Sequence, residues 1–205
     1  RVETGQPAND AEIERAVRHI LRMDDDIEQF YEMASVEKGL DWVVANNGGR
    51  LLRSPTVWED LIKTICTTNC SWALTRNMVT NLVQKLGRQN DAGDRAFPTA
   101  EAMAEVDVEF YRDEIRAGYR GPYLLELARL VAEGNIDPES WLRNELPTPE
   151  IKKQMKAVKG VGDYAAENLL KLVGRYDGLA LDSWLRAGFY KRHNGGTPCP
   201  DKQIE

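Results

Sequence analysis

The sequence predicts an all-α fold. Apolar residues recur three and four positions apart along most of the chain, whereas the alternation typical of β-strands is confined to short stretches. These periodic segments begin at helix-capping residues and end at glycines. A length of 205 residues with 42% hydrophobic content can bury the core of one compact domain or of two small lobes.

The first half of the chain predicts five helices. Asn9 to Glu12 form a capping-box pattern, which opens a helix with Ile13, Val17, Ile20 and Leu21 on one face. Two further helices are expected near 24–34 and 37–46, the second ending at Asn46-Asn47-Gly48-Gly49. Ser54 and Pro55 provide an N-cap and a first-turn proline for a helix that runs to about Cys66. The fifth should run from about Ser71 to Leu86 and end at Gly87.

The second half begins with a polar segment, Arg88 to Arg95, which predicts a surface loop. Pro98-Thr99 start a helix at 100–105, and further helices are expected near 107–116, 121–134, 138–145 and 148–157. The last leads into KAVKGVGDYAAENLLKLVGRYDGLALDSWLR, residues 156–186. This stretch predicts a helix-hairpin-helix motif over about 151–175, with its turn at Gly160-Val161-Gly162. A loop over about 174–183 then delivers Asp182 to a third helix, Ser183–Arg192.

The net charge of −6 argues against a protein that coats nucleic acid electrostatically, but the charge is unevenly distributed. Residues 151–176 carry six basic side chains against two acidic ones, a local charge of +4. Past Asp182, Arg186, Lys191 and Arg192 follow with no acidic residue before Asp201. A local basic face on an acidic body suits a small footprint on nucleic acid.

The three cysteines, Cys66, Cys70 and Cys199, are expected to be reduced thiols, two of them buried. Cys66 and Cys70 lie one helical turn apart, but His19 and His193 are both distant in sequence, so a shared metal is disfavoured. No apolar run approaches the roughly 20 residues that cross a bilayer, and the N-terminus carries no signal-peptide pattern. We therefore expect an intracellular protein that does not enter the membrane.

The hairpin glycines, with an aspartate 20 residues after the second, resemble the helix-hairpin-helix (HhH-GPD) DNA glycosylase superfamily. Three further segments are similar to its 8-oxoguanine glycosylase and 3-methyladenine glycosylase II branch: RHILRMDDDIEQFYEMA, GGRLLRSPTVWEDLIKTICTTNCSW and GYRGPYLLELARLVAEG. The resemblance covers most of residues 1–205 and implies a two-lobed helical fold with a base pocket between the lobes. Relatives often carry an N-terminal β domain and a further C-terminal helix, so this chain is expected to be a fragment or a natural deletion. Three cysteines exclude the four-cysteine iron–sulfur cluster of the endonuclease III branch.

The resemblance implies removal of damaged bases in base excision repair, with Asp182 as the catalytic residue. Breaking an N-glycosidic bond builds positive charge on the deoxyribose, which an ionised carboxylate stabilises. A helix N-terminus favours that ionised form. The alternative is that Asp182 only caps the helix that follows, but its spacing from the hairpin favours catalysis. The proline that relatives place before this aspartate is replaced here by Leu179-Ala180-Leu181.

Tyr164 predicts a monofunctional enzyme that hydrolyses the bond with water. Relatives that also cleave the strand place a Schiff-base lysine two residues after the second hairpin glycine, and Lys159 and Lys171 lie in the wrong register to replace it. The Tyr164 ring would instead line the base pocket and stack on an extruded base, unless it packs between the two helices. Trp72 would reach the same pocket, whereas Trp58, Trp141 and Trp184 are expected in the core or between helices.

The resemblance also implies how double-stranded DNA with a damaged base is held. Gly160, Gly162 and the amide of Ala165 would bind a phosphate, and Asn69 would fill the gap left by the flipped nucleotide, unless it only ends a helix. Backbone carbonyls of Lys156, Val158 and Val161 would hold a structural Na⁺ or K⁺. The segment Tyr119-Arg120-Gly121-Pro122-Tyr123 is assigned to packing, with Arg120 as a candidate contact to the DNA backbone.

No cofactor is required for this chemistry, and a monomer is expected. The alternative function is a DNA-binding protein that keeps the hairpin and has no catalytic activity. The sequence does not distinguish alkylated, oxidised and deaminated bases as the substrate.

Overall fold

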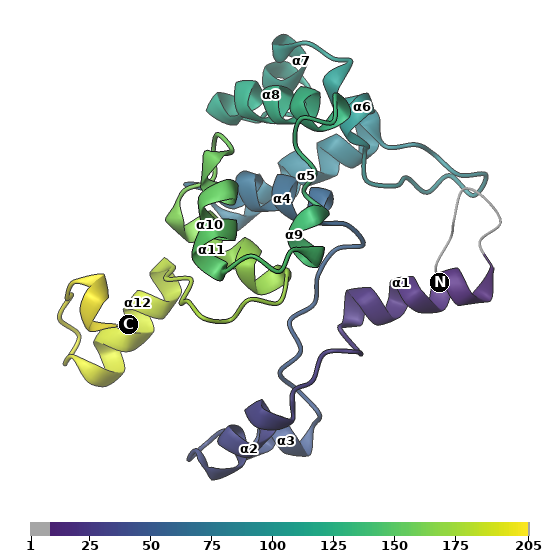
Figure 1. The fold of residues 1–205 in the computed structure, drawn as a ribbon. Helices are drawn as coiled ribbons and strands as arrows, with labels where there is room; N and C mark the ends of the chain where they lie inside the picture. The colour runs from purple at the N-terminus through teal and green to yellow at the C-terminus, as the bar shows by residue number, and fades with distance from the viewer. Residues whose placement is uncertain (1–8, 205) are drawn as a thin grey trace. The chain divides into compact units, whose positions relative to one another are not determined.

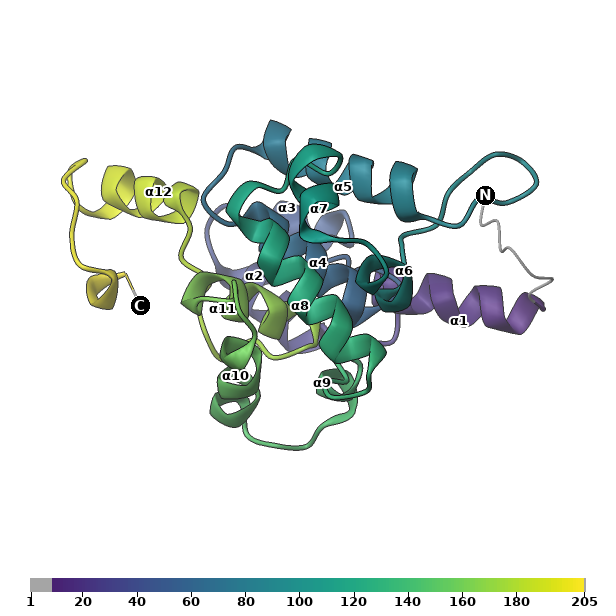
Figure 2. The same ribbon diagram turned by 90° about the horizontal axis from the view of Figure 1, so that it is seen from above.

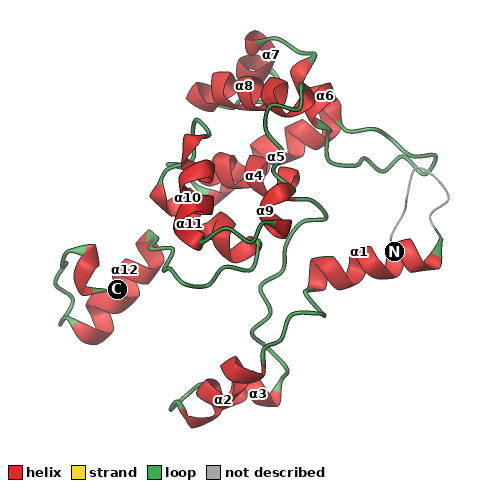
Figure 3. Cartoon of the chain, in the orientation of Figure 1, coloured by secondary structure: helices red, strands yellow, loops and turns green. Residues whose placement is uncertain are grey.

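The computed structural model describes residues 9–204, and in that range it contains helices and no β-strand (Figure 1 and Figure 3). The chain divides into two compact units. One comprises the residues up to Thr56 together with Gln89–Asp94, and the other comprises Val57–Arg88 and Arg95 onward. The prediction of an all-α fold is therefore confirmed. Within 9–204, no helix combines the length and the apolar character that a membrane crossing demands.

The first unit contains α1 (Asp10–Leu21), α2 (Glu28–Val36) and α3 (Asp41–Ala45). The predicted capping box is present: Asn9 Oδ1 accepts the Glu12 N–H at 2.9 Å, and the Glu12 carboxylate accepts the Asn9 N–H at 3.2 Å. The helices expected at 24–34 and 37–46 both begin later than predicted. Arg22 adopts a left-handed conformation that ends α1, and the aspartates that follow stabilise this turn.

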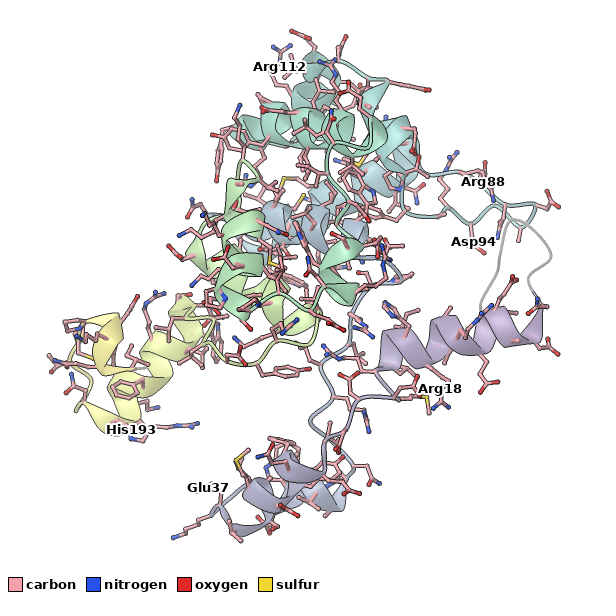
Figure 4. The ribbon with its side chains drawn as sticks, in the orientation of Figure 1. Arg18, Glu37, Arg88, Asp94, Arg112 and His193 are labelled. Carbon is pink, nitrogen blue, oxygen red and sulfur yellow. The ribbon has the colours of Figure 1, made fainter. Side chains whose placement is uncertain are left out.

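Those aspartates act as hydrogen-bond acceptors in the turn. Asp25 pairs with the buried Arg22 guanidinium at 2.6 Å, and Asp26 accepts the Glu28 N–H at 3.0 Å. Asp24 accepts from Arg18, which is labelled in Figure 4. Because short acidic side chains bond readily to nearby backbone and basic groups, the run Asp24-Asp25-Asp26 forms a turn where a helix was predicted.

The core of the second unit is built around α4 (Val57–Thr67), which contacts α5 (Trp72–Leu86) and α11 (Asp163–Leu172). Most of its residues are buried, so it is surrounded by other helices: Val57, Trp58, Asp60, Leu61, Ile62, Thr64, Ile65 and Cys66. The helix begins two residues after the predicted first-turn Pro55. The Trp58 N–H is bound by the Glu139 carboxylate at 3.0 Å, a first-turn contact from a residue far away in the sequence.

Five short elements follow: α6 (Ala100–Ala104), α7 (Val108–Asp113), the 3₁₀ turn η1 (Gly118–Arg120), α8 (Gly121–Ala132) and α9 (Ser140–Arg143). Helices α6 and α7 pack against α8, as both views of the ribbon show (Figure 1 and Figure 2). The helix predicted at 107–116 stops at Asp113, because the chain turns at Arg116 (φ 62°) and buries Ile115 and Ala117.

The last helices are α10 (Thr148–Ala157), α11 and α12 (Ser183–His193), followed by the 3₁₀ turn η2 (Asp201–Gln203). Helices α10 and α11 contact each other, and Ile151 and Met155 of α10 and Leu169 of α11 are fully buried. By contrast, none of the residues of α12 is buried, although all of them are described. Figure 4 labels His193 at the end of this helix.

Candidate functional site

A hollow of about 1140 Å³ lies in the second unit and is lined by separate parts of the chain. These parts are the α4–α5 connection, the tyrosines at the start of α8, the α10–α11 hairpin and the first turn of α12. The structure brings these predicted site residues to the hollow: Asn69, Trp72, Lys156, Val158, Gly160, Val161, Gly162, Tyr164, Ala165 and Asp182. Arg120, the candidate contact to the DNA backbone, is buried and does not line it. Segments more than 100 positions apart in the sequence therefore share one surface.

Glycine occupies positions 160 and 162 of the hairpin for different structural reasons. Gly160 has φ +90°, and a Cβ there would lie 3.2 Å from Tyr123 Cδ2 and 3.5 Å from Ile65 Cγ2. Both the backbone conformation and the packing therefore favour glycine at 160. Gly162 has φ −88°, which any residue adopts, and a Cβ there would meet nothing within 4 Å. The folded chain alone does not require glycine at 162, but its absence of a side chain leaves the hairpin backbone open to a ligand.

The N-terminus of α11 offers backbone donors to the hollow. Gly162 is the N-cap and has no side chain to cap the helix, and the first intrahelical bond is that of the Ala166 N–H to the Gly162 carbonyl at 2.9 Å. The amides of Tyr164 and Ala165 precede that bond, so they lack the intrahelical acceptor that later amides have. Amides at a helix N-terminus, together with the helix dipole, favour an anion.

Basic side chains surround the same helix start. Lys156 Nζ binds Asp163 Oδ1 at 2.7 Å, and Lys152 Nζ lies 3.6 Å from the same oxygen. The hydrogen bond from Lys156 is the main cause that lowers the pKa of Asp163. Lys159 Nζ, at the hairpin turn, binds Glu126 Oε2 at 2.7 Å. Both Lys156 and Lys159 therefore line the hollow with their amines already engaged by carboxylates.

Asp182 is the N-cap of α12. Its Oδ1 accepts the Leu185 N–H at 2.7 Å, and its carbonyl accepts the Arg186 N–H at 3.1 Å. The capping role is thus real, and the same half-buried residue also lines the hollow. The cap occupies Oδ1 and fixes the orientation of the carboxylate at the start of α12. Capping and participation in chemistry are therefore compatible at this position.

Several contacts hold the loop that carries Asp182 in place, although no proline precedes this aspartate in Leu179-Ala180-Leu181. Arg175 donates to the Asn144 carbonyl at 2.6 Å, and the Thr148 hydroxyl donates to Asp177. Gly178 packs so closely on Glu167 that a Cβ would clash with the carboxylate. Glu167 is itself held by Lys152 at 2.5 Å. These contacts, with the burial of Ala180 and Leu181, fix the loop from several helices.

Aromatic side chains around the hollow are unusually exposed. Trp72 is 71% exposed, Tyr164 is 38% exposed, and Trp184 is 85% exposed. The assignment of Trp184 to the core or to helix packing is wrong, because it stands in the first turn of α12, a helix without a buried residue. Trp58 and Trp141 are buried as predicted, and the Trp58 Nε1–H donates to the Pro98 carbonyl at 3.0 Å. Exposed rings beside bare backbone amides are suited to stacking on a planar ligand.

Asn69 connects α4 to α5 in a left-handed conformation with φ 46°. Its Nδ2 donates to the Tyr119 hydroxyl at 3.4 Å, across the hollow lining. Hydrogen bonding with Thr68, and secondarily with Asn69, holds the pKa of Tyr119 below its usual range. The left-handed conformation of Asn69, shortly after the end of α4, agrees with the alternative that it ends a helix, while its exposure leaves the amide accessible.

Tyr119 is a site residue that the sequence reasoning missed, since its segment was assigned to packing. Its ring stacks on the Arg120 guanidinium at 4.5 Å and meets Tyr123 edge-on at 6.1 Å. Arg120 is buried and donates to the Thr68 carbonyl, so it holds the α4–α5 connection from inside. The sequence offered no clear signal for this role, because it does not show that Tyr119 is exposed while the neighbouring Arg120 is buried.

The comparisons with known proteins identify DNA glycosylases as similar to this chain. No protein-family model matches the chain. It is 24% identical over 161 residues to "Putative DNA-3-methyladenine glycosylase YfjP" of Bacillus subtilis, covering 77% of this chain and 54% of that protein. It is 22% identical over 190 residues to the N-glycosylase/DNA lyase of Saccharomyces cerevisiae, covering 87% and 50%. The chain therefore spans about half the length of these curated relatives.

Two solved structures have a fold similar to that of this chain. The Clostridium acetobutylicum 8-oxoguanine glycosylase/lyase in complex with double-stranded DNA matches with a TM-score of 0.80 at 21% identity, over 96% of this chain and 68% of that one. The 3-methyladenine DNA glycosylase of Archaeoglobus fulgidus matches with a TM-score of 0.76 at 20% identity, over 97% and 69%. The chain thus has the helical fold of the helix-hairpin-helix DNA glycosylases. Within that class its structural neighbours are the 8-oxoguanine and 3-methyladenine glycosylases, as the sequence resemblance implied.

Proposed function

We propose that this chain carries the DNA glycosylase activity of base excision repair and releases a damaged base by hydrolysis. The observation that carries the proposal is the common lining of one hollow by Asp182 and the uncapped N-terminus of α11. One feature supplies a fixed carboxylate and the other supplies donors for a phosphate. A nucleotide bound through its phosphate would bring its sugar close to that carboxylate.

Asp182 acts on the sugar in this proposal. As the N-glycosidic bond breaks, the deoxyribose gains oxocarbenium character, and a fixed negative charge lowers the energy of that state. The base leaves with the electron pair of the broken bond, water adds to the sugar carbon, and the proton that this water loses balances the proton that the released base gains. The contacts that fix Asp182, through the Leu185 and Arg186 amides, support this role because a preorganised charge needs no rearrangement during the reaction.

The hairpin grips the damaged strand. The amides of Tyr164 and Ala165 bind a phosphate, and the open space at Gly162 lets the strand approach the backbone closely. The carbonyls of Lys156, Val158 and Val161 are suited by their chemistry to Na⁺ or K⁺, and they lie at the end of α10 and in its turn. The Val158 carbonyl already accepts the Val161 N–H at 3.1 Å, which leaves one lone pair for an ion.

Base recognition is assigned to the exposed rings. Tyr164 and Trp72 line the hollow and would stack on the extruded base, whose unstacking cost they offset. Asn69 would enter the gap in the duplex, where its amide hydrogen-bonds the base left without a partner. The half-exposed state of Tyr164 favours the pocket role over packing between α10 and α11.

We propose a monofunctional enzyme, although two of the similar proteins are named as glycosylase/lyases. Tyr164 has no amine, and the lysines that line the hollow, Lys156 and Lys159, are paired with Asp163 and Glu126. Burial lowers the pKa of Lys171, which would favour a nucleophilic amine, but this residue is not part of the hollow lining. Hydrolysis without a Schiff base is the reaction that these side chains support.

The test is a panel of duplexes that each carry one lesion (3-methyladenine, 7-methylguanine, 8-oxoguanine or a deaminated base) assayed for release of the free base. The wild-type chain should release at least one of these bases. Asp182→Asn should bind the same duplex and lose excision by about 10²-fold or more. Excision by this variant at the wild-type rate would remove Asp182 from the mechanism.

The second candidate function is a non-catalytic DNA-binding protein. Its specific support is the cap of Asp182 on α12, which accounts for the carboxylate without any chemistry. Binding to abasic or lesion-containing duplexes, with no base released from any member of the panel, would favour this candidate.

A further inference from the structure

Arg186 joins the end of the chain to the loop that carries Asp182. Its Nε and Nη2 bind Asp201 Oδ1 and Oδ2, each at 2.8 Å, in a two-pronged ion pair. Its Nη1 donates to the Leu181 carbonyl at 2.9 Å. One guanidinium therefore connects η2 with the peptide unit that precedes Asp182, and Arg186 also lines the hollow.

The Leu181 contact restrains Asp182 from its N-terminal side. The peptide between Leu181 and Asp182 is planar, so a bond that fixes the Leu181 carbonyl also limits the orientation of the Asp182 backbone. From the C-terminal side, Asp182 is restrained by the Leu185 and Arg186 amides of α12. Residues on both sides of the carboxylate are thus fixed, and a planar guanidinium is suited to binding a carboxylate and a carbonyl at once.

Asp201 is itself held in place by the final turn of the chain. The Tyr190 hydroxyl of α12 donates to the Cys199 carbonyl at 3.2 Å, and the Gly196 N–H donates to the Tyr190 carbonyl at 2.7 Å. These bonds return the segment after α12 onto the helix from which Arg186 projects. The ion pair between Arg186 and Asp201 therefore joins α12 to η2, and the hydrogen bonds of Tyr190 hold the segment between them.

The charges have a second consequence. The pKa of Arg186 is raised chiefly by its hydrogen bond with Asp201, and Asp182 is among the smaller contributions. Without Asp201, the guanidinium charge would be left to act on Asp182 and would oppose the positive charge that forms on the sugar. With Asp201 bound, that guanidinium charge is largely compensated, and Asp182 keeps its full effect.

We propose that Arg186, locked by Asp201, is a positioning residue that holds Asp182 at the geometry needed for base excision. This inference depends on the proposed glycosylase function. The contact to Leu181 takes the place of a rigid residue in a loop whose sequence, Leu179-Ala180-Leu181, contains no proline. Small displacements of a catalytic group are costly to the rate, which is the physical reason for such a restraint.

The experiment uses the full chain with Arg186→Gln, Asp201→Asn and a control, Lys202→Gln, which removes a positive charge next to Asp201. Amide hydrogen exchange over residues 179–186 is measured first, without DNA. Arg186→Gln and Asp201→Asn should each speed the exchange of the backbone amides at positions 185 and 186 by about tenfold or more, whereas Lys202→Gln should not. Unchanged exchange in Arg186→Gln would overturn the proposal, whatever the activity of the chain.

Single-turnover base release and affinity for an abasic duplex are measured next. Arg186→Gln should lower the excision rate by roughly 10- to 100-fold with the dissociation constant within about twofold of wild type. Arg186→Lys, which keeps the charge and one donor, should recover part of the rate. Wild-type excision in Arg186→Gln would also overturn the proposal. If the wild-type chain releases no base, the proposed glycosylase function fails, and the exchange measurement still decides whether Arg186 positions Asp182.

Discussion

At the scale of single residues, Asp182 combines a structural contact with a proposed chemical one. Its Oδ1 accepts the Leu185 N–H in the manner of an N-cap, while the residue lines the hollow next to the hairpin. Because asparagine and aspartate are equally good N-caps, a substitution with Asn removes the charge and keeps the cap. The two roles can therefore be separated.

We expect Asp182→Asn to keep its free energy of unfolding within about 0.5 kcal/mol of wild type, and Asp182→Ala to lose about 1 kcal/mol with its cap. Both variants should lose base excision by a similar factor, because both lack the carboxylate. Urea unfolding and single-turnover base release provide the measurements. A variant with Asn that is as destabilised as the one with Ala would mean that the charge itself stabilises the fold.

Cys66 gives a residue-scale prediction about reactivity. Burial raises the pKa of its thiol to about 12, so the thiolate that alkylating reagents attack is scarce up to that pH in the folded chain. At pH 8 we expect an alkylating reagent to leave Cys66 unmodified and to modify the half-buried Cys70 or Cys199 first. Peptide mass spectrometry measures the sites, with the urea-unfolded chain as the control in which all three react. Early labelling of Cys66 would contradict its burial in α4.

At the scale of elements, two glycines of the hairpin between α10 and α11 have different roles: one is required by the fold, and the other is proposed to serve binding. Gly160 is required by its positive φ and by contact with Tyr123, whereas Gly162 has an ordinary conformation and open space around it. Gly162 serves as the N-cap of α11, and the absence of a side chain there leaves its backbone open to a ligand. In the proposed function this is the phosphate of the damaged strand.

Gly160→Ala should destabilise the chain by about 1–3 kcal/mol, because alanine is strained in this conformation. Gly162→Val should cost about 1 kcal/mol at most, because valine is a poorer N-cap than glycine, and it should weaken binding to every duplex, since its side chain would cover the helix N-terminus. Urea unfolding and fluorescence anisotropy with matched damaged and undamaged duplexes measure the two effects. A loss confined to one lesion would place Gly162 in base recognition instead of phosphate binding.

At the scale of the whole molecule, the distribution of basic groups bears on the reaction product. The chain is acidic overall, and the lysines that line the hollow are paired with carboxylates. Strand cleavage requires an uncharged amine that reaches the sugar carbon. The proposed product is therefore an intact strand with an abasic site.

We expect this abasic strand to break only after alkali or heat treatment, and we expect borohydride to trap no covalent complex of protein and DNA. Denaturing gel electrophoresis of the strand and of the protein measures both outcomes. Tyr164→Lys is an informative variant, because a trapped complex would show that position 164 reaches the sugar. Efficient trapping of the unmodified chain would contradict the monofunctional assignment and would point to another amine, such as Lys159.

The sequence by itself determined the features that depend on neighbours along the chain. The helical periodicity, the capping box at Asn9 and the turn at Gly160 to Gly162 were predicted correctly, because backbone propensity and short-range hydrogen bonds produce them. The cap at Asp182, also a local contact, had been the alternative to a catalytic role. The same local rules misplaced α2, where the side chains of Asp25 and Asp26 stabilise a turn instead of a helix.

Only the tertiary structure decided which residues lie exposed around the hollow and what holds them. Trp184 has the large apolar side chain typical of a core residue but is solvent-exposed, whereas Arg120 is charged but buried. The contacts of Asn69 with Tyr119 and of Arg186 with Asp201 span 50 and 15 positions, so no local pattern encodes them. Burial and long-range pairing depend on how the helices pack, and that packing energy is distributed over residues throughout the sequence.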